Sequence, residues 1–162
     1  MKIDFVKMSA EHCRDIMDIF NYYISNSFAA YPETELPYEF FDKFLEATKG
    51  YPAFSVQMNG QTIGFCFLRP YNPFPTFKEC AEITYFIHKD FTGKGIGKIV
   101  LNKLESEARK IGIKTILASI ASENPQSIAF HKNNGFRQCG RFVKVINKKG
   151  KQIDLIWMQK MI

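Results

Sequence analysis

Residues 91–101 combine glycine and lysine in a way that suits the binding of an anionic ligand. The segment reads FTGKGIGKIVL and stands between a strand-like stretch and a helix-like stretch. Its three glycines occupy alternate positions: Gly93, Gly95 and Gly97. The first turn of a helix carries free N–H groups and about half a positive charge, and glycines ahead of it let the backbone approach a ligand closely. The segment therefore predicts a phosphate or pyrophosphate site, to which Lys94 and Lys98 add positive charge.

Two familiar nucleotide-binding motifs do not describe this segment. The dinucleotide-binding pattern requires GxGxxG in the first strand–helix–strand unit, whereas GxGxG stands late in this chain. The P-loop requires four residues between its glycines, followed by Lys-Ser or Lys-Thr, and this is also missing. The alternative to an anion site is a glycine-rich turn that leads into an ordinary helix.

Hydrophobic periodicity and turn residues predict the elements that must position this segment. Asn59-Gly60 is a strong hairpin signal, and the proline-rich residues 69–77 are expected to form a loop. Strands are predicted at 3–6, in two runs within 51–68, and at 81–87, 113–120, 136–146 and 152–160. Helices are predicted at 9–24, 38–49, 96–111 and 123–135.

The order of these elements, β-α-α-β-β-β-α-β-α-β-β, predicts an α+β fold. Consecutive strands without an intervening helix pair antiparallel, and the βα crossover in the second half implies one parallel pair. We expect a mixed, mostly antiparallel sheet with helices on both faces. The 162 residues are enough for one domain with a sizeable core, so a single domain over residues 1–162 is predicted.

Composition narrows the class of protein. Hydrophobic residues make up 46% and charged residues 23% of the chain, which is typical of globular proteins. The sequence contains no apolar run near the roughly 18 residues of a membrane span. Its N-terminal segment has no apolar signal core, so a cytoplasmic location is expected. Scattered cysteines without a CxxC pair predict buried, reduced thiols rather than disulfides or a metal site: Cys13, Cys66, Cys80 and Cys139.

The net charge of +6 leaves three interpretations open: a nucleic-acid surface, a site for an anionic small molecule, or a solvated basic face. The closest cluster of lysines flanks a glycine, as the tip of a hairpin would: Lys144, Lys148, Lys149 and Lys151. We expect these four lysines to form a solvated face. Since no aromatic-basic strand motif accompanies them, a nucleic-acid partner is not expected.

The glycine segment resembles the acyl-CoA pyrophosphate loop of the GNAT superfamily of N-acetyltransferases, usually written Arg/Gln-x-x-Gly-x-Gly/Ala. The predicted order of elements also matches that fold, so the resemblance covers nearly the whole chain. Thr92 departs from the pattern, because Arg or Gln is usual at that position. A hydroxyl reaches less far than those side chains, so pyrophosphate binding is expected to depend more on backbone amides and lysines.

Three further segments resemble the phosphinothricin acetyltransferase-like branch of this superfamily. They are FNYYISNSFAAYPETE in the first helix and beyond, AEITYFI in the fourth strand, and ENPQSIAFHKNNGF around the last helix. The resemblance implies acetyl-CoA as co-substrate, no metal, and transfer of an acetyl group to the primary amine of a small, amino-acid-like acceptor. It also implies a possible homodimer, with no membrane partner.

The same resemblance implies the residues that contact acetyl-CoA. The pantetheine arm is expected beside the fourth strand and the start of the last helix, and the pyrophosphate at the glycines. The implied residues are Tyr85, Phe86, Ile87, Gly93, Lys94, Gly95, Ile96, Gly97, Lys98 and Asn124. For the three strand residues the alternative is plain sheet core, and for Asn124 it is a helix N-cap beside Pro125.

Transfer to nitrogen requires a neutral amine. An amine with a pKa of ~10.4 is about 3.4 units above neutral pH, so its deprotonation costs roughly 4.6 kcal/mol. Glu82 matches the catalytic glutamate of the branch and is the candidate general base; a solvated carboxylate or an ion-pair partner is the alternative. Glu79 is a nearby competitor. His131 is the candidate acid for the departing thiolate, although a histidine on a helix face is more often structural.

By analogy with the branch, four residues line the acceptor pocket: Phe28, Tyr31, Arg69 and Tyr71. An arginine there would suit a carboxylate or phosphinate, because its planar fork donates two hydrogen bonds; the alternative for Arg69 is a surface charge at the end of a loop. Two other functions stay open at this point. One is a non-catalytic acyl-CoA-binding or sensing module, and the other is a nucleic-acid binder.

Overall fold

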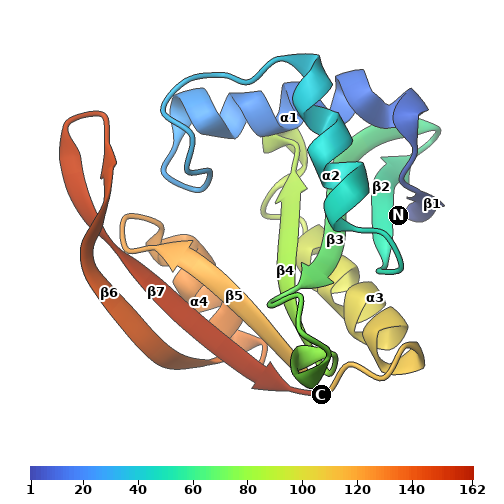
Figure 1. Ribbon diagram of the computed structural model, residues 1–162. Helices are drawn as coiled ribbons and strands as arrows, with labels where there is room; N and C mark the ends of the chain where they lie inside the picture. The colour runs from blue at the N-terminus through green and yellow to red at the C-terminus, as the bar shows by residue number, and fades with distance from the viewer.

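The computed structural model describes residues 1–162 and confirms the predicted order of elements (Figure 1). The helices are α1 (Cys13–Asn26), α2 (Phe41–Ala47), α3 (Ile96–Lys110) and α4 (Pro125–Asn133). The strands are β1 (Asp4–Lys7), β2 (Ala53–Met58), β3 (Gln61–Pro70), β4 (Cys80–Ile87), β5 (Thr115–Ala121), β6 (Arg137–Lys148) and β7 (Lys151–Met161).

The first two helices begin later than predicted. Ser9 forms a capping box with His12, but this box opens a short 3-10 turn, and α1 starts only at Cys13. A second 3-10 turn, Tyr38–Phe40, precedes α2. The α2 helix ends at Ala47, and Gly50, with a left-handed φ of +78°, then turns the chain as predicted.

The seven strands form one sheet in the order β1-β2-β3-β4-β5-β7-β6. All neighbours are antiparallel except β4 and β5, which are parallel as predicted. The parallel pairing covers only three positions, from Cys80 opposite Thr115 to Glu82 opposite Leu117. Beyond Glu82 the two strands diverge, as Figure 1 shows. The rest of β4 therefore has a strand neighbour on one side only.

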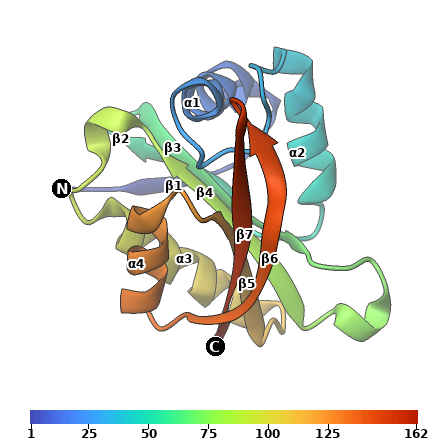
Figure 2. The same ribbon diagram turned by 90° about the vertical axis from the view of Figure 1, so that its left-hand side faces the viewer.

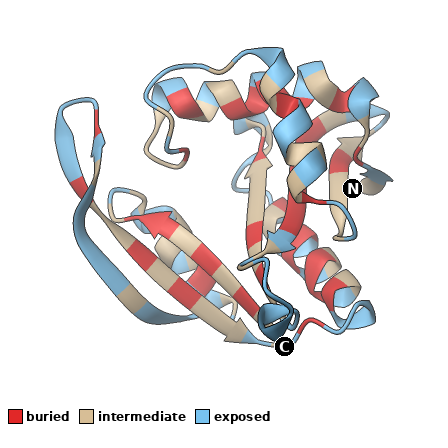
Figure 3. Cartoon of the chain, in the orientation of Figure 1, coloured by how far each residue is buried: buried red, intermediate tan, exposed pale blue.

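Each face of the sheet has its own core, and Figure 3 shows both as buried stripes on the strands and helices. The first core lies under α3 and contains Val100, Leu104 and their neighbours on β3, β4 and β5. The second lies under α1 and α2 and is rich in aromatic rings. In it Phe65 and Phe86 stack with their ring centroids 5.5 Å apart. Neighbouring residues of β4 therefore serve different cores.

No helix of the structure combines the length and the apolar character that crossing a membrane requires. The four cysteines are unpaired, and they are less uniformly buried than expected. Cys66 is buried, whereas Cys139 is exposed on β6. Cys139 lies on the outermost strand of the sheet, which has a neighbour on one side only.

A buried ion pair joins α3 to the end of β7. The carboxylate of Glu105 is 7% exposed and accepts a hydrogen bond from the ammonium of Lys160. Arg109, one turn further along α3, approaches the second carboxylate oxygen at 3.6 Å. A buried carboxylate needs such partners, because an unpaired buried charge is strongly destabilising.

We therefore expect Glu105→Gln to lower the free energy of unfolding by about 1–3 kcal/mol, since a charge-assisted buried hydrogen bond is weakened. Urea denaturation followed by circular dichroism measures this. Glu107→Gln on the same helix is the matched control. Its carboxylate pairs with two lysines at the surface, Lys103 and Lys110, and the change should be smaller. Equal losses in the two variants would contradict a special role for the buried pair.

Candidate active site

The glycine segment forms the turn that leads into α3. A 3-10 turn, Lys89–Phe91, follows β4, and Gly93 and Gly95 then adopt left-handed backbone angles with φ of +73° and +79°. Gly95 is the N-cap of α3. A Cβ built on either glycine would meet no atom within 4 Å, so the space above them is open. The predicted use of glycine for special backbone angles and open approach is confirmed at these two positions.

Gly97 has a different role from the other two glycines. It lies inside the first turn of α3 without a left-handed φ, and a Cβ there would lie 3.3 Å from the ring of Phe130 on α4. The missing side chain lets α3 and α4 approach each other. The third glycine of the motif is therefore explained by helix packing.

The polar side chains of the turn are engaged to different degrees. The Thr92 hydroxyl donates to the carbonyl of Lys89 at 2.9 Å, so it serves the turn itself. The Lys94 ammonium donates to the carbonyl of Asp90 at 2.9 Å and lies 5.2 Å from the centre of the Phe91 ring. Lys98 is exposed and makes no hydrogen bond or ion pair. Free helix N–H groups and Lys98 are thus the groups most available to an anion.

The backbone of β4 is open toward the gap between β4 and β5. The N–H of His88 donates to Ile63 on β3, and alternation along an antiparallel pair then directs the backbone of Phe86 toward β3 as well. The backbones of Tyr85 and Ile87 consequently point toward the gap. The hydroxyl of Tyr23 on α1 donates to the carbonyl of Ile87. An extended ligand with amide groups could pair here like an added strand.

Phe86 differs from its two neighbours. Its backbone faces β3, and its ring packs among the aromatic residues under α1, 5.3 Å from Phe20. The structure thus gives Phe86 a place in the core and no backbone group toward the gap.

Glu82 lies at the point where β4 and β5 separate, and its side chain is 13% exposed. Arg69 stands directly opposite it on β3, and its Nη2 lies 3.1 Å from Glu82 Oε1. The hydroxyl of Ser119 on β5 also reaches Oε1, at 3.5 Å, while the second carboxylate oxygen has no hydrogen-bond partner. The Tyr31 hydroxyl lies 3.0 Å from that of Ser119. One oxygen of Glu82 is therefore held, and the other is free.

Three predicted site residues that are far apart in the sequence lie close together in the structure: Tyr31, Arg69 and Glu82. Arg69 is not a charge at the end of a loop, because β3 extends to Pro70 and includes it. Burial raises the pKa of the Tyr31 hydroxyl, and its hydrogen bond to Ser119 opposes part of that effect. Tyr31 is therefore neutral at physiological pH and available as a hydrogen-bond donor.

Ser119 and Trp157 were not predicted as site residues. They are register partners on β5 and β7, so they lie side by side on the face that carries Glu82. The ring of Tyr71, after β3, meets Trp157 edge-to-face at 6.0 Å. Alternation in the two predicted strands could have placed both residues on one face, but it could not have shown that this face borders Glu82. The ring of Phe28, the fourth residue predicted for the acceptor pocket, has the Lys149 ammonium 5.9 Å from its centre.

His131 lies on the other face of β4, buried to 5% exposure. Its Nδ1 is 2.7 Å from the carbonyl of Ser127, which can only accept, so Nδ1 carries the proton. Nε2 then accepts a hydrogen bond from the Tyr85 hydroxyl at 2.6 Å. Burial lowers the pKa of His131 and raises that of Tyr85. Both ring nitrogens of His131 are occupied by protein groups.

Asn124 caps α4. Its side-chain oxygen accepts a hydrogen bond from the N–H of Ser127 at 3.2 Å, which is the alternative that the sequence left open. Its amide NH₂ group makes no hydrogen bond within the protein and stays available to a ligand.

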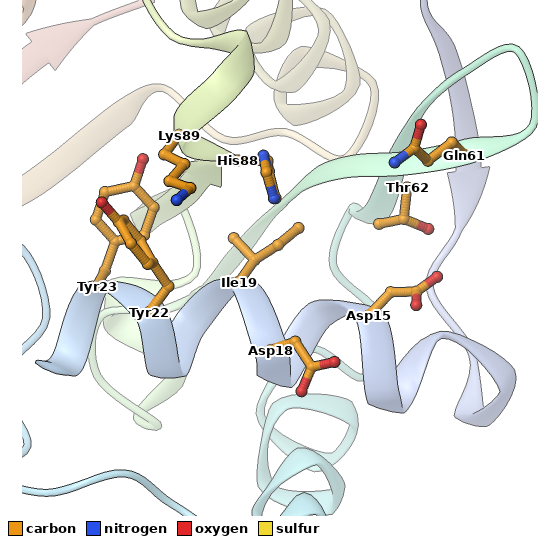
Figure 4. Close-up of a pocket in the computed structure, with 9 residues that line it drawn as sticks. All are labelled: Asp15, Asp18, Ile19, Tyr22, Tyr23, Gln61, Thr62, His88 and Lys89. Carbon is orange, nitrogen blue, oxygen red and sulfur yellow. The ribbon is translucent and has the colours of Figure 1, made fainter. Parts of the chain in front are cut away.

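A half-open cavity of about 250 Å³ lies elsewhere, between α1, the start of β3 and the end of β4 (Figure 4). Asp15, Asp18 and Lys89 contribute charges to its wall. None of the predicted site residues lines it, and Glu82 is not among its neighbours. The geometry around the β4–β5 gap, with its convergent polar side chains, therefore defines the candidate active site. No three His, Cys, Asp or Glu side chains gather there or elsewhere as a metal-binding group.

Comparison with known proteins gives a consistent picture. A family model described as an acetyltransferase (GNAT) domain matches residues 9–157. The L-amino acid N-acyltransferase MnaT of Escherichia coli (strain K12) is 29% identical over 161 residues, covering 98% of this chain and 92% of that protein. An L-methionine sulfoximine/L-methionine sulfone acetyltransferase of Pseudomonas aeruginosa is 31% identical over 149 residues, covering 89% and 86%. The crystal structure of a GNAT superfamily phosphinothricin acetyltransferase from Sinorhizobium meliloti in complex with AcCoA superposes with a TM-score of 0.92, at 27% identity over 100% of this chain and 89% of that one.

Gly95→Ala should weaken the binding of acetyl-CoA. A left-handed backbone costs an L-residue about 1–2 kcal/mol, and relief of that strain would shift the N–H groups at the start of α3. Gly60→Ala is the matched control, since Gly60 has a φ of +78° in the β2–β3 turn and is equally uncrowded. Both variants should lose similar stability in urea, but only Gly95→Ala should bind acetyl-CoA more weakly in calorimetry. Unchanged affinity in Gly95→Ala would contradict the assignment of this turn.

His131 should make the stability of the protein depend on pH. Its pKa is lower in the folded state than in the unfolded state, so the unfolded state binds more protons once the pH falls below the ordinary histidine pKa of ~6.5. Stability supplied by neutral His131 is thus present above pH ~6.5 and lost as the pH falls below it. Urea titrations at pH 7.5, 6.5 and 5.5 should show a shallower loss in His131→Gln than in wild type. Parallel losses would contradict the prediction.

Proposed function

Because this chain belongs to the GNAT family of acetyltransferases, we propose that it acetylates the primary amine of a small, amino-acid-like acceptor, with Glu82 as general base. The chain is an N-acetyltransferase and acetyl-CoA is its co-substrate. The observation that carries the proposal is the position of Glu82. Its carboxylate lies where β4 and β5 separate and has one oxygen held and one free.

The proposed path of acetyl-CoA follows the open backbone groups. Its pyrophosphate would accept hydrogen bonds from the N–H groups at the start of α3, with Lys98 nearby. Its pantetheine arm would then run along the gap, pairing with the backbones of Tyr85 and Ile87, with the amide of Asn124 on the opposite side. This path directs the thioester toward Glu82, because β4 leads from the glycine turn back to that residue.

In this reaction Glu82 removes a proton from the incoming amine. The amine nitrogen attacks the carbonyl carbon of the thioester, the C–N bond forms, the C–S bond breaks, and the amine proton leaves to the carboxylate. Arg69 and Ser119 both contact Oε1 and so orient the side chain, which leaves Oε2 as the basic atom. General-base catalysis of this kind contributes about 10²–10⁴-fold to a rate.

Two observations support an amino-acid-like acceptor: the charged groups at the site and the similarity to known enzymes. Arg69 uses one nitrogen on Glu82, and its other N–H groups are free to bind a carboxylate. Tyr71 and Trp157 add an aromatic wall. The similar enzymes are named for L-amino acids and for L-methionine sulfoximine or sulfone. An amino acid or close analogue, with its carboxylate at Arg69 and its amine near Glu82, fits these groups.

The departing thiolate needs less help from the protein than the incoming amine does. A thiol with a pKa of ~8.5 needs little acid assistance near neutral pH. Because neutral His131 carries its proton on Nδ1 and accepts from Tyr85 at Nε2, we propose that His131 orients the Tyr85 hydroxyl and supplies no proton itself, so the thiolate takes its proton from solvent. We also propose a cytoplasmic location, because four unpaired cysteines suit a reducing compartment. The homodimer implied by the resemblance stays a prediction.

Glu82→Gln should fold, bind acetyl-CoA normally and lose about 10²–10⁴-fold in kcat at pH 7. The loss should shrink at higher pH, where more of the acceptor amine is already neutral. A thiol-release assay with L-methionine sulfone and a panel of amino acids measures turnover, and calorimetry measures acetyl-CoA binding.

Glu79→Gln is the matched control for this experiment. Glu79 precedes β4, is 52% exposed and pairs with Lys114, so its variant should keep full activity. Undiminished turnover in Glu82→Gln would remove Glu82 from the mechanism. Acetyl-CoA binding without thiol release by the wild type, whatever amine is offered, would favour the sensing alternative.

A further inference from the structure

Lys148 is the residue that departs most from what the sequence predicts. It belongs to the lysine cluster expected to form a solvated face, yet it is 1% exposed. Its ammonium donates to three carbonyls: Ile24 at 2.8 Å, Ser27 at 2.9 Å and Ala30 at 2.7 Å. Its three N–H donors are thus all used, and no carboxylate takes part. Burial lowers the pKa of Lys148, which is the cost that these three hydrogen bonds offset.

The three carbonyls belong to the end of α1 and the loop that follows it. The last carbonyls of a helix lack intrahelical partners and favour a nearby cation, but the last turn of α1 has no basic residue. The turn between β6 and β7 supplies that cation from more than a hundred residues away, and Figure 2 shows this turn beside α1. The neighbouring Lys149 strengthens the contact. Its ammonium donates to the carbonyl of Ser25, and its N–H donates to the carboxylate of Glu33.

The lysine contact spans the opening between the two parts of the sheet, where β4 and β5 no longer pair. Since β4 and β5 pair at only three positions, sheet hydrogen bonds do not fix how far β5, β7 and β6 stand from α1. Side chains must set that distance. Besides the lysine contact, three side-chain contacts cross the opening between the two parts of the sheet: Tyr31 with Ser119, Ser119 with Glu82, and the rings of Tyr71 and Trp157. The lysine contact is the strongest of the four, because it comprises several charge-assisted hydrogen bonds, some of them buried.

We propose that Lys148 is a positioning residue of the acetyltransferase reaction, which holds the loop after α1 against the β6–β7 turn and so fixes the width of the acceptor site. The loop it holds carries Tyr31, whose hydroxyl meets Ser119, and Ser119 in turn contacts Glu82. Lys148 touches neither substrate nor base and acts through this chain of contacts. The inference rests on the proposed function, since it assigns the space bordered by Glu82, Ser119 and Trp157, called the cleft below, to the acceptor.

The test compares Lys148→Met with Lys151→Gln. Methionine keeps the unbranched stem as far as the ε position and removes every donor. Lys151 lies across the same turn, is exposed and pairs with Glu123, so its variant controls for loss of charge at the hairpin. Glu33→Ala is a milder second variant, because it removes the partner of the Lys149 N–H from an exposed loop. It remains informative should Lys148→Met fold poorly.

Two readouts separate positioning from simple stability. Trp157 is the only tryptophan in the chain, so acrylamide quenching of its fluorescence reports on the cleft directly. Lys148→Met should increase this quenching and speed hydrogen exchange in residues 24–36, with a smaller change in Glu33→Ala and none in Lys151→Gln. In the thiol-release assay with L-methionine sulfone, or the best amino acid of the panel, the acceptor KM should rise about tenfold, equivalent to ~1.4 kcal/mol. The KM for acetyl-CoA should not change.

Each outcome bears on a different claim. Quenching and exchange equal to wild type in both Lys148→Met and Glu33→Ala would overturn the positioning role, whether or not the chain proves active. A looser cleft with an unchanged acceptor KM would overturn it as well, because Lys148 would then serve stability alone. A wild type that releases no thiol with any amine would instead refute the proposed function, while the fluorescence and exchange results would still decide whether Lys148 sets the cleft width.

Discussion

The short parallel pairing of β4 and β5 is the constraint on which the rest of the structure depends. Three residue pairs join these strands, and then they separate. The separation leaves the backbone of β4 open on one side and places Glu82 at the vertex, where a ligand lying in the gap would end. It also divides the sheet into two parts, β1 to β4 and β5 to β7, which are joined only by these three residue pairs. Every other feature of the site either uses this gap or compensates for it.

Alternation along β4 assigns opposite tasks to its two faces. Even-numbered residues from Glu82 to Phe86 face α1 and the acceptor side, whereas Tyr85 faces α4 and meets His131. The candidate base, Glu82, and the candidate acid, His131, thus lie on opposite faces of the sheet at β4. Only a ligand that lies between the strands, in the plane of the sheet, can reach both faces. The backbone of Tyr85 and the N–H of Ile87, whose carbonyl already accepts from Tyr23, provide that position.

Local patterns predicted the elements, and they predicted the site to the extent that it is local. The hairpin at Asn59-Gly60, the left-handed glycines before α3 and the cap at Asn124 all depend on residues close in sequence. The pairing of Arg69 with Glu82 followed from register, which the sequence suggests but does not specify. Ser119 was missed because a serine in an apolar strand is uninformative until its neighbour across the gap is known. Gly97 matched the motif for a reason that only the packing of α4 reveals.

Lys148 shows that a charged residue need not be exposed. It can be buried where the end of a helix has no cation of its own. Four lysines around a glycine suggest a solvated tip, and three of them are exposed. The fourth meets carbonyls at the end of α1, where the last turn of the helix has no basic residue, and nothing in the hairpin sequence itself indicates this contact. Once the sheet opens between β4 and β5, some contact has to join its outer strands to α1. A lysine that satisfies carbonyls of both the helix and its loop does this without placing a second charge beside Glu82, so the carboxylate keeps Arg69 as its one cationic partner.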